Sequence, residues 1–254
     1  MPEPRPEDDT QEEHKRVSIL MLLPNMITLM GMCLGLTAIR FAIEGRFTTA
    51  VAMILLAMLA DGIDGFVARR LGAESAMGAQ LDSLSDFLCF GVAPAIVLYQ
   101  LHLTQAAGFG WIFALLFAAA TCLRLARFNV MSGQNEKGTG PKTHFVGVPA
   151  PAGASLALLP VFLTLSGLVD LGAVPIVVAI WMAFVGLLMI SKLATLAPRS
   201  VRVPQRFAAV IMVAMVVVIG LGFTRPWLVL VMINAAYLTT ILYALIQTRG
   251  RILS

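Results

Sequence analysis

The sequence has 254 residues, of which 59% are hydrophobic and only 13% charged, with a formal net charge of +4. A soluble domain is nearer half apolar and a quarter charged, so this composition excludes an ordinary water-soluble protein and indicates a membrane protein. The positive charge does not indicate nucleic-acid binding, because the basic residues stand at the ends of hydrophobic runs. The three cysteines lie in apolar stretches without C-x-x-C spacing, which argues against a disulfide framework or a zinc site.

Residues 1–16 are polar and rich in proline and acid, and they are predicted to form a disordered cytoplasmic tail rather than a secretory signal peptide. Residues 17–254 are predicted to form a single transmembrane domain. Because a helix needs roughly 20 residues to cross about 30 Å of hydrocarbon, the hydrophobic runs predict about eight spans. They fall near 22–43, 48–69, 80–101, 107–128, 149–168, 172–191, 207–223 and 226–246. The fold class predicted is therefore an all-α, polytopic transmembrane helix bundle.

The distribution of Lys and Arg predicts the orientation of these spans. With the N-terminus in the cytoplasm, only Arg40, Arg46 and Arg225 fall outside, and the other fifteen of the 18 basic residues fall inside. Both termini are therefore predicted to be cytoplasmic.

Four carboxylates stand out at the cytoplasmic ends of the second and third spans. Asp61 and Asp64 are three residues apart and Asp82 and Asp86 are four apart, so each pair shares one helical face. An ionised carboxylate at membrane depth is costly and marks a functional site by default. Residues 70–79 are short enough to join the two spans as an antiparallel hairpin, which would let all four carboxylates converge. Oxygen ligands without nearby histidine or thiolate favour Mg²⁺ or Mn²⁺ over zinc.

Small residues flank both carboxylate pairs and leave room for a bulky ligand. Gly65 and Ala68 lie near the face of Asp61 and Asp64, Gly78 lies one turn before Asp82, and Arg69 could reach a phosphate. A carboxylate-based ion transporter is the alternative from another functional class. That alternative predicts acids deep in several spans, whereas here they cluster at one membrane face on two neighbouring helices.

The run DGIDGFVAR at 61–69, followed by Gly78, Asp82 and Asp86, resembles the signature of the CDP-alcohol phosphatidyltransferase family. Members of this family are membrane enzymes that move a phosphatidyl or similar group from a CDP-linked lipid to an alcohol, so residues 17–254 would be the catalytic domain and 61–86 its signature motif. The resemblance implies that Asp61, Asp64 and Asp82 bind divalent metal, two ions in all, and that Asp86 both approaches the metal and acts as general base. The CDP-diacylglycerol contacts that we expect on this basis come from Asn25, Thr28, Asp61, Gly65, Ala68, Arg69, Ser75 and Gly78.

Four further segments resemble the bacterial integral-membrane members of the family that use serine as the acceptor. They are PNMIT at 24–28, FGVAP at 90–94, RLARFN at 124–129 and FVGVPAP at 145–151, and the resemblance covers about residues 20–192. The expected reaction therefore joins CDP-diacylglycerol and L-serine to give phosphatidylserine and CMP. The same chemistry with glycerol phosphate or inositol phosphate, or with an archaeal-type ether lipid, stays open.

The carboxylate of serine needs a cation, and the candidates for serine contacts are Arg124, Arg127, Asn129 and Lys142. The basic residues at 199–206 are expected to meet anionic membrane lipids. The family resemblance further suggests a homodimer in the inner (cytoplasmic) membrane, with the active site on the cytoplasmic side.

Overall fold

The computed structural model describes residues 19–73, 75–106, 108–135, 148–191, 218 and 220–248, and every regular element among them is a helix. The predicted all-α class is thereby confirmed. The elements are α1 (Ile19–Ile43), α2 (Phe47–Leu71), α3 (Ala76–Asp86), η1 (Phe87–Val92), α4 (Ala93–Leu98), η2 (Tyr99–Leu103), α5 (Phe109–Asn135), α6 (Ala150–Ala157), α7 (Leu159–Leu165), α8 (Pro175–Ile190) and α10 (Pro226–Thr248). The predicted tail at 1–16 and most of the predicted seventh span lie outside the described residues.

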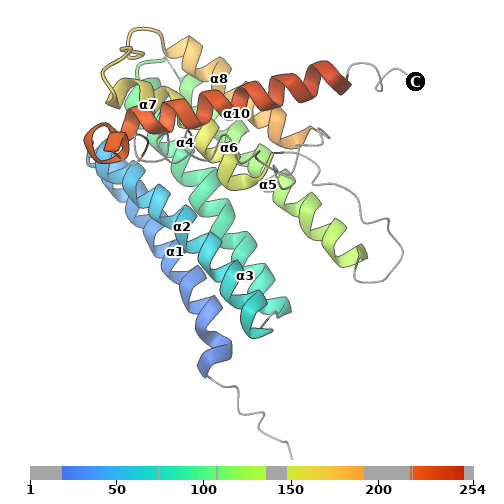
Figure 1. Cartoon of the computed structure of the whole chain (residues 1–254). Helices are drawn as coiled ribbons and strands as arrows, with labels where there is room; N and C mark the ends of the chain where they lie inside the picture. Colours follow the sequence, from blue (N-terminus) through green and yellow to red (C-terminus); the bar gives the residue numbers. More distant parts are fainter. Residues whose placement is uncertain are drawn as a thin grey trace, which may run out of the picture.

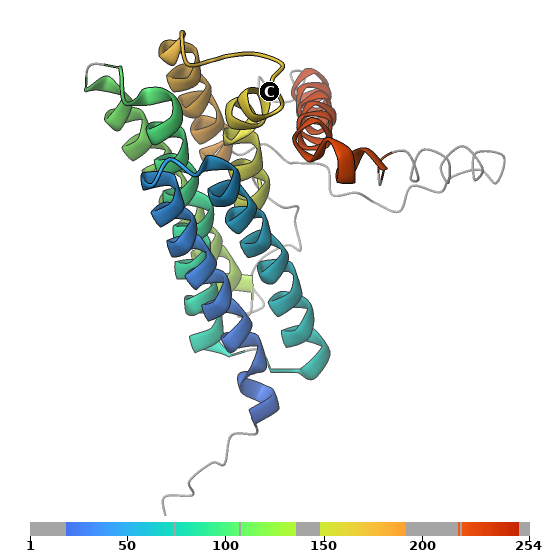
Figure 2. The same ribbon diagram turned by 90° about the vertical axis from the view of Figure 1, so that its left-hand side faces the viewer.

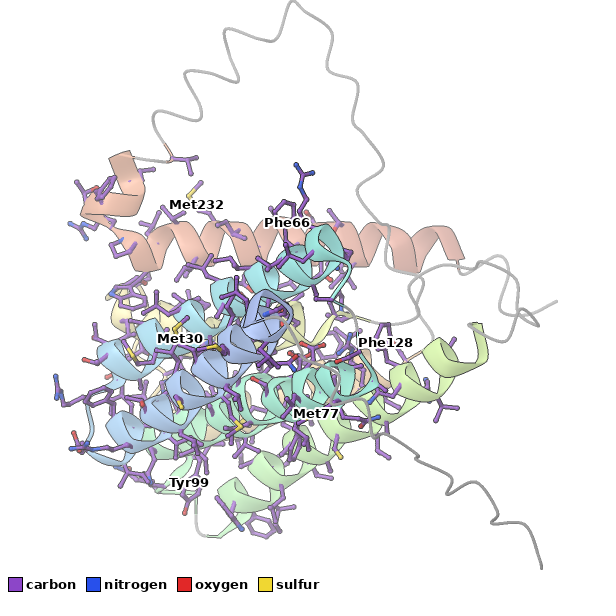
Figure 3. The ribbon with its side chains drawn as sticks, turned by 90° about the horizontal axis from the view of Figure 1, so that it is seen from below. Met30, Phe66, Met77, Tyr99, Phe128 and Met232 are labelled. Carbon is purple, nitrogen blue, oxygen red and sulfur yellow. The ribbon has the colours of Figure 1, made fainter. Side chains whose placement is uncertain are left out.

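Four helices in the described part of the chain are long and apolar enough to cross a membrane, so the chain is a multi-pass membrane protein. They are Leu22–Ile43, Phe47–Leu71, Ala76–Leu103 and Phe109–Met131, and they correspond to the first four predicted spans. Figure 1 shows them running side by side, with the start of α1, the end of α2, the start of α3 and the end of α5 at the same lower end of the bundle. Large apolar side chains such as Met30, Phe66 and Met77 are exposed on the outside of this bundle (Figure 3).

The third span is one continuous helical rod that widens into a π-helical turn directly after Asp86. In this turn the amide of Ala93 donates to the carbonyl of Leu88, five residues earlier. The physical reason is Pro94, which has no N–H and whose ring would clash with the carbonyl four residues before it in a regular α-helix. Such π-turns often occur at functional sites, and this one adjoins a predicted catalytic residue.

The first span, α1, is the shared packing partner of the two helices that carry the carboxylates. It packs along α2 and along α3, whereas α2 and α3 have little direct contact with each other. The tight approach to the third span uses Gly35, since a Cβ there would lie 2.6 Å from the Cys89 sulfur. The carboxylate helices are thus antiparallel, as expected, but they are held together mainly through α1.

The predicted fifth span, 149–168, is not one helix but the two short helices α6 and α7, separated at Leu158. Pro160 explains the break, because it has no N–H to donate to the carbonyl of Leu156, four residues earlier. That carbonyl instead accepts a hydrogen bond of 2.8 Å from the indole Nε1 of Trp181 in α8. The sixth predicted span, 172–191, is the shorter α8.

The last predicted span, 226–246, is a helix, but α10 crosses the direction of the first four spans. Figure 1 shows it lengthwise across the upper part of the bundle, and Figure 2 shows it nearly end-on. It is attached there by Asn234, whose amide donates to Ser155 of α6 at 3.0 Å, and by Trp227, which stacks on Phe162 of α7. Among the described residues, four of the eight predicted spans are therefore helices long enough to cross a membrane.

The bond from Trp181 to Leu156 generates a stability prediction. Trp181→Phe keeps an aromatic ring but removes the indole donor to the fully buried Leu156 carbonyl, and we expect a loss of about 1 kcal/mol in unfolding free energy. In a Pro160→Ala background the backbone N–H of residue 160 can serve that carbonyl, so the same substitution should cost much less. Thermal unfolding in detergent of the wild type, Trp181→Phe, Pro160→Ala and the double variant measures how far the two substitutions depend on each other. Equal losses in both backgrounds would contradict the explanation.

Candidate metal centre and active site

The first carboxylate pair lies in the last turns of α2. Asp64 is buried and Asp61 is half-buried. The helix ends shortly afterwards at Gly72, which adopts the left-handed conformation (φ +59°) that glycine tolerates best, and the amides of Gly72 and Ala73 return to the carbonyl of Ala68. After this sharp stop, α3 starts at the same end of the bundle (Figure 1).

The second pair lies on α3, whose start is capped by Ser75. The Ser75 hydroxyl oxygen accepts a hydrogen bond of 3.0 Å from the amide of Gly78, which satisfies one of the free N–H groups of the first turn. Gly78 also permits a close approach of α1, because a Cβ at this position would lie 2.9 Å from the Asn25 side-chain oxygen. Asp82 and Asp86, both half-buried, follow one and two turns later.

The structure brings the carboxylates of the two helices together. Side-chain oxygens of Asp61, Asp64 and Asp82 all lie within 4.8 Å of one another. The carboxyl group of Asp86 lies beside that of Asp61, close enough for a hydrogen bond between the side chains. All four aspartates that the sequence singled out therefore gather at one place.

This cluster has the chemistry of a divalent-cation site. Its ligands are hard carboxylate oxygens, which suit Mg²⁺ or Mn²⁺. None of the four aspartates forms an ion pair with a basic residue within the described ranges; the ion pairs found there join Glu44 to Arg40 and Arg46. Several like charges gathered in a partly buried place without a bound counter-charge are strongly destabilising, and a cation between them removes the repulsion. The residues present therefore fit a metal.

The remaining residues expected at the nucleotide surround this cluster on α1, α2 and α3. Arg69 folds back over Gly65, since a Cβ at Gly65 would lie 3.4 Å from a guanidinium nitrogen of Arg69. Ala68 is half-buried on the same helix. Asn25 faces Gly78 across the α1–α3 contact, and the hydroxyl of Thr28 donates to the carboxylate of Asp64 at 2.6 Å. The sequence pattern offered no signal for this last bond, which joins residues 36 positions apart.

The residues expected at serine divide into different environments. Arg124 of α5 is half-buried and interacts electrostatically with Asp86 and Asp61. Arg127 is exposed and donates at 2.8 Å to the carbonyl of Ile190, at the end of α8. Asn129 exchanges hydrogen bonds with Ser83, the neighbour of Asp82, at 2.9 and 3.1 Å. Lys142 lies outside the described residues.

Tyr237 of α10 also belongs to this neighbourhood, although no motif or spacing in the sequence singles it out. It is half-buried and close enough to Arg124 for an electrostatic interaction. Arg124 is thus close to the carboxylates of α2 and α3 and also to a tyrosine of α10.

Comparison with known proteins agrees with the signature. Residues 21–189 match the family model described as CDP-alcohol phosphatidyltransferase. The chain is 37% identical over 235 residues to a CDP-diacylglycerol–serine O-phosphatidyltransferase of Mycobacterium leprae, covering 92% of this chain and 78% of that protein. It is 35% identical to the protein of the same name from Mycobacterium tuberculosis, covering 91% and 80%. An archaetidylserine synthase of Methanothermobacter thermautotrophicus is 35% identical over 55% of this chain and 58% of its own length.

The carboxylate cluster generates a prediction about metal binding. Each of three variants, Asp61→Asn, Asp64→Asn and Asp82→Asn, loses one charged ligand. Each should weaken Mn²⁺ binding by more than about tenfold, because loss of a residue that only hydrogen-bonds to a metal ligand already has an effect of that size. Electron paramagnetic resonance of free Mn²⁺, titrated against purified protein in detergent, measures this affinity.

Glu44→Gln is the matched control, because Glu44 is paired with Arg40 at 2.8 Å in the turn that joins α1 to α2 and is not part of the cluster. It should leave Mn²⁺ binding unchanged. An aspartate whose replacement leaves the affinity at the wild-type value would not be a ligand.

Proposed function

Because the chain belongs to the CDP-alcohol phosphatidyltransferase family, we propose that it transfers the phosphatidyl group of CDP-diacylglycerol to the hydroxyl of L-serine, giving phosphatidylserine and CMP. The observation that carries the proposal is the meeting of Asp61, Asp64 and Asp82 within 4.8 Å, with Asp86 beside them. The choice of serine is supported by the names of relatives that cover most of this chain.

In the proposed reaction the serine hydroxyl oxygen attacks the phosphorus that carries the diacylglycerol. A new O–P bond forms, the pyrophosphate P–O bond to CMP breaks, and CMP leaves with the electron pair. Asp86 accepts the hydroxyl proton, directly or through a water molecule. A serine hydroxyl is a weak nucleophile at neutral pH, so positioning by the surrounding side chains must supply much of the rate.

Asp61, Asp64, Asp82 and Asp86 are the residues that would hold two divalent ions, Mg²⁺ or Mn²⁺. When bound, these ions supply charge neutralisation for the pyrophosphate oxygens and the departing CMP. Arg69, folded over Gly65, offers a guanidinium to a phosphate, and Asn25 with Gly78 lines the approach along α1 and α3. Ala68 and Ser75 complete the nucleotide side of the proposed site, whereas the hydroxyl of Thr28 is bonded to Asp64.

We assign the carboxylate of serine to Arg124 rather than to Arg127. Arg124 is close enough to the base candidate Asp86 for an electrostatic interaction, whereas a nitrogen of Arg127 donates to the carbonyl of Ile190. We do not assign Asn129 to a direct contact with serine, because its amide donates to Ser83 on α3. Tyr237 would place its phenol next to the guanidinium and so limit the size of the acceptor.

The proposed location is the cytoplasmic side of the inner membrane. The end of the bundle that carries the carboxylates also carries Arg69, Arg70, Arg124 and Arg127, which agrees with the positive-inside rule. Serine and CMP are soluble and can enter and leave there, while the acyl chains stay in the bilayer. The homodimer and the contacts with anionic lipids stay predictions.

The first test is transfer of radiolabelled serine to lipid by the purified protein with CDP-diacylglycerol and Mg²⁺ or Mn²⁺. We expect labelled phosphatidylserine that disappears with chelator. Asp86→Asn should retain CDP-diacylglycerol binding better than Asp64→Asn does and yet lose transfer to serine, since the amide cannot accept the proton. If the phosphatidyl group goes to glycerol phosphate or inositol phosphate in preference to serine, the acceptor is another alcohol. Ion transport without any phosphatidyl transfer would contradict the proposed enzymatic function.

A second test addresses the acceptor contact. Removal of a charge-assisted hydrogen bond typically costs about 1.5–3 kcal/mol, so Arg124→Gln should raise the KM for serine about ten- to a hundredfold. The KM for CDP-diacylglycerol should change much less. Arg127→Gln, three residues further along α5, is the comparison and should affect mainly thermal stability. If both KM values rise together in Arg124→Gln, its guanidinium supports the carboxylate cluster and does not bind serine.

A further inference from the structure

Thr28 of α1 makes hydrogen bonds to both helices that carry the carboxylates. Its hydroxyl Oγ1 lies 2.6 Å from Oδ2 of Asp64 on α2. Its backbone carbonyl accepts a hydrogen bond of 3.3 Å from the hydroxyl of Ser85 on α3. Ser85 lies between Asp82 and Asp86 in the sequence, so one residue of α1 is joined to both halves of the cluster.

The hydroxyl proton of Thr28 belongs to the bond with Asp64. Among the described residues, the one other acceptor for it is the carbonyl of Pro24 at 3.1 Å, and one proton serves the nearer, charged acceptor best. Both side chains are shielded from solvent, with Thr28 7% and Asp64 4% exposed. Water therefore cannot readily replace the bond, and Thr28, together with the backbone amide of Gly65, orients the Asp64 carboxylate.

The position of Thr28 relative to α3 is itself fixed by the next turns of α1. Cys89, one turn after Ser85, donates to the carbonyl of Gly31 at 3.3 Å. Gly35, one turn further, leaves room for the same sulfur, because a Cβ would lie only 2.6 Å from it. Three successive turns of α1, at Thr28, Gly31 and Gly35, thus set the axial register between α1 and the third span. The turn that contains Thr28 is the one that contacts the carboxylates.

We propose that Thr28 is a positioning residue of the metal centre, which fixes Asp64 through its hydroxyl and the Asp82–Asp86 segment of α3 through its carbonyl and Ser85. The inference rests on the proposed role of Asp64 as a metal ligand. It differs from a direct contact with the nucleotide, because it requires Thr28 to act before any nucleotide is bound.

The test is Mn²⁺ affinity, measured by electron paramagnetic resonance without nucleotide or serine, for Thr28→Val and Thr28→Ser. Valine keeps the shape of threonine but has no hydroxyl, so binding should weaken about ten- to a hundredfold, as for other outer-shell losses. Serine retains the hydroxyl and should stay within about threefold of wild type, well below that loss. Ser85→Ala, which removes the longer and neutral bond, should weaken binding about two- to fivefold.

Thr37→Val is the matched control, because Thr37 lies on the same helix and its hydroxyl donates only to the carbonyl of Cys33 at 2.7 Å. It should leave Mn²⁺ affinity unchanged, and an equal loss in Thr37→Val would overturn the proposal in favour of a general effect on α1. Normal Mn²⁺ affinity in Thr28→Val, with a raised KM for CDP-diacylglycerol, would overturn it in favour of direct nucleotide contact. The Mn²⁺ assay contains no acceptor alcohol, so its result does not change if the wild-type enzyme prefers another alcohol to serine. A wild-type protein that binds no Mn²⁺ would overturn both the positioning role of Thr28 and the proposed function.

Discussion

Like charges gathered in a partly buried place are the constraint on which the rest of this structure depends. Oxygens of Asp61, Asp64 and Asp82 lie within 4.8 Å of one another, and two unit charges about 4 Å apart near a protein surface repel each other by roughly 4 kcal/mol. A divalent cation relieves this repulsion, but only if the carboxylates are held in place before it arrives. The helices around the cluster can be understood as the means of holding them.

The first helix provides this support, although it carries none of the acids. α1 packs along both α2 and α3, and its small residues let the third span approach closely. In a membrane, helices gain little from burying apolar surface against each other, so close packing and hydrogen bonds between helices decide their register. The bonds of Thr28, Gly31 and their partners on α2 and the third span do this at the depth of the carboxylates.

The acceptor side shows how a helix can present two similar residues to different neighbours. Arg124 and Arg127 are three residues apart on α5, but their neighbours differ. Arg124 is close enough to Asp86 and Tyr237 for electrostatic interactions, whereas Arg127 donates to the carbonyl of Ile190 at the end of α8. Asn129 then joins α5 to α3 next to Asp82 through Ser83. The proposed serine site is therefore built from helices that the chain reaches long after the signature motif.

The sequence by itself determined the features that depend only on residues close together along the chain. Spans follow from runs of apolar residues, and the shared faces of the two aspartate pairs follow from spacings of three and four, so the all-helical class and the four carboxylates could be predicted. Only the tertiary structure decided the role of Thr28, the divergence of Arg124 and Arg127, the crossing path of α10, and the donation from Trp181 to the carbonyl that Pro160 leaves free. The physical reason is that these helices are apolar on nearly every side, since lipid and protein interior are alike to them. No periodic pattern in the sequence therefore tells which face meets which helix, and contacts between distant residues have to be seen in the folded chain.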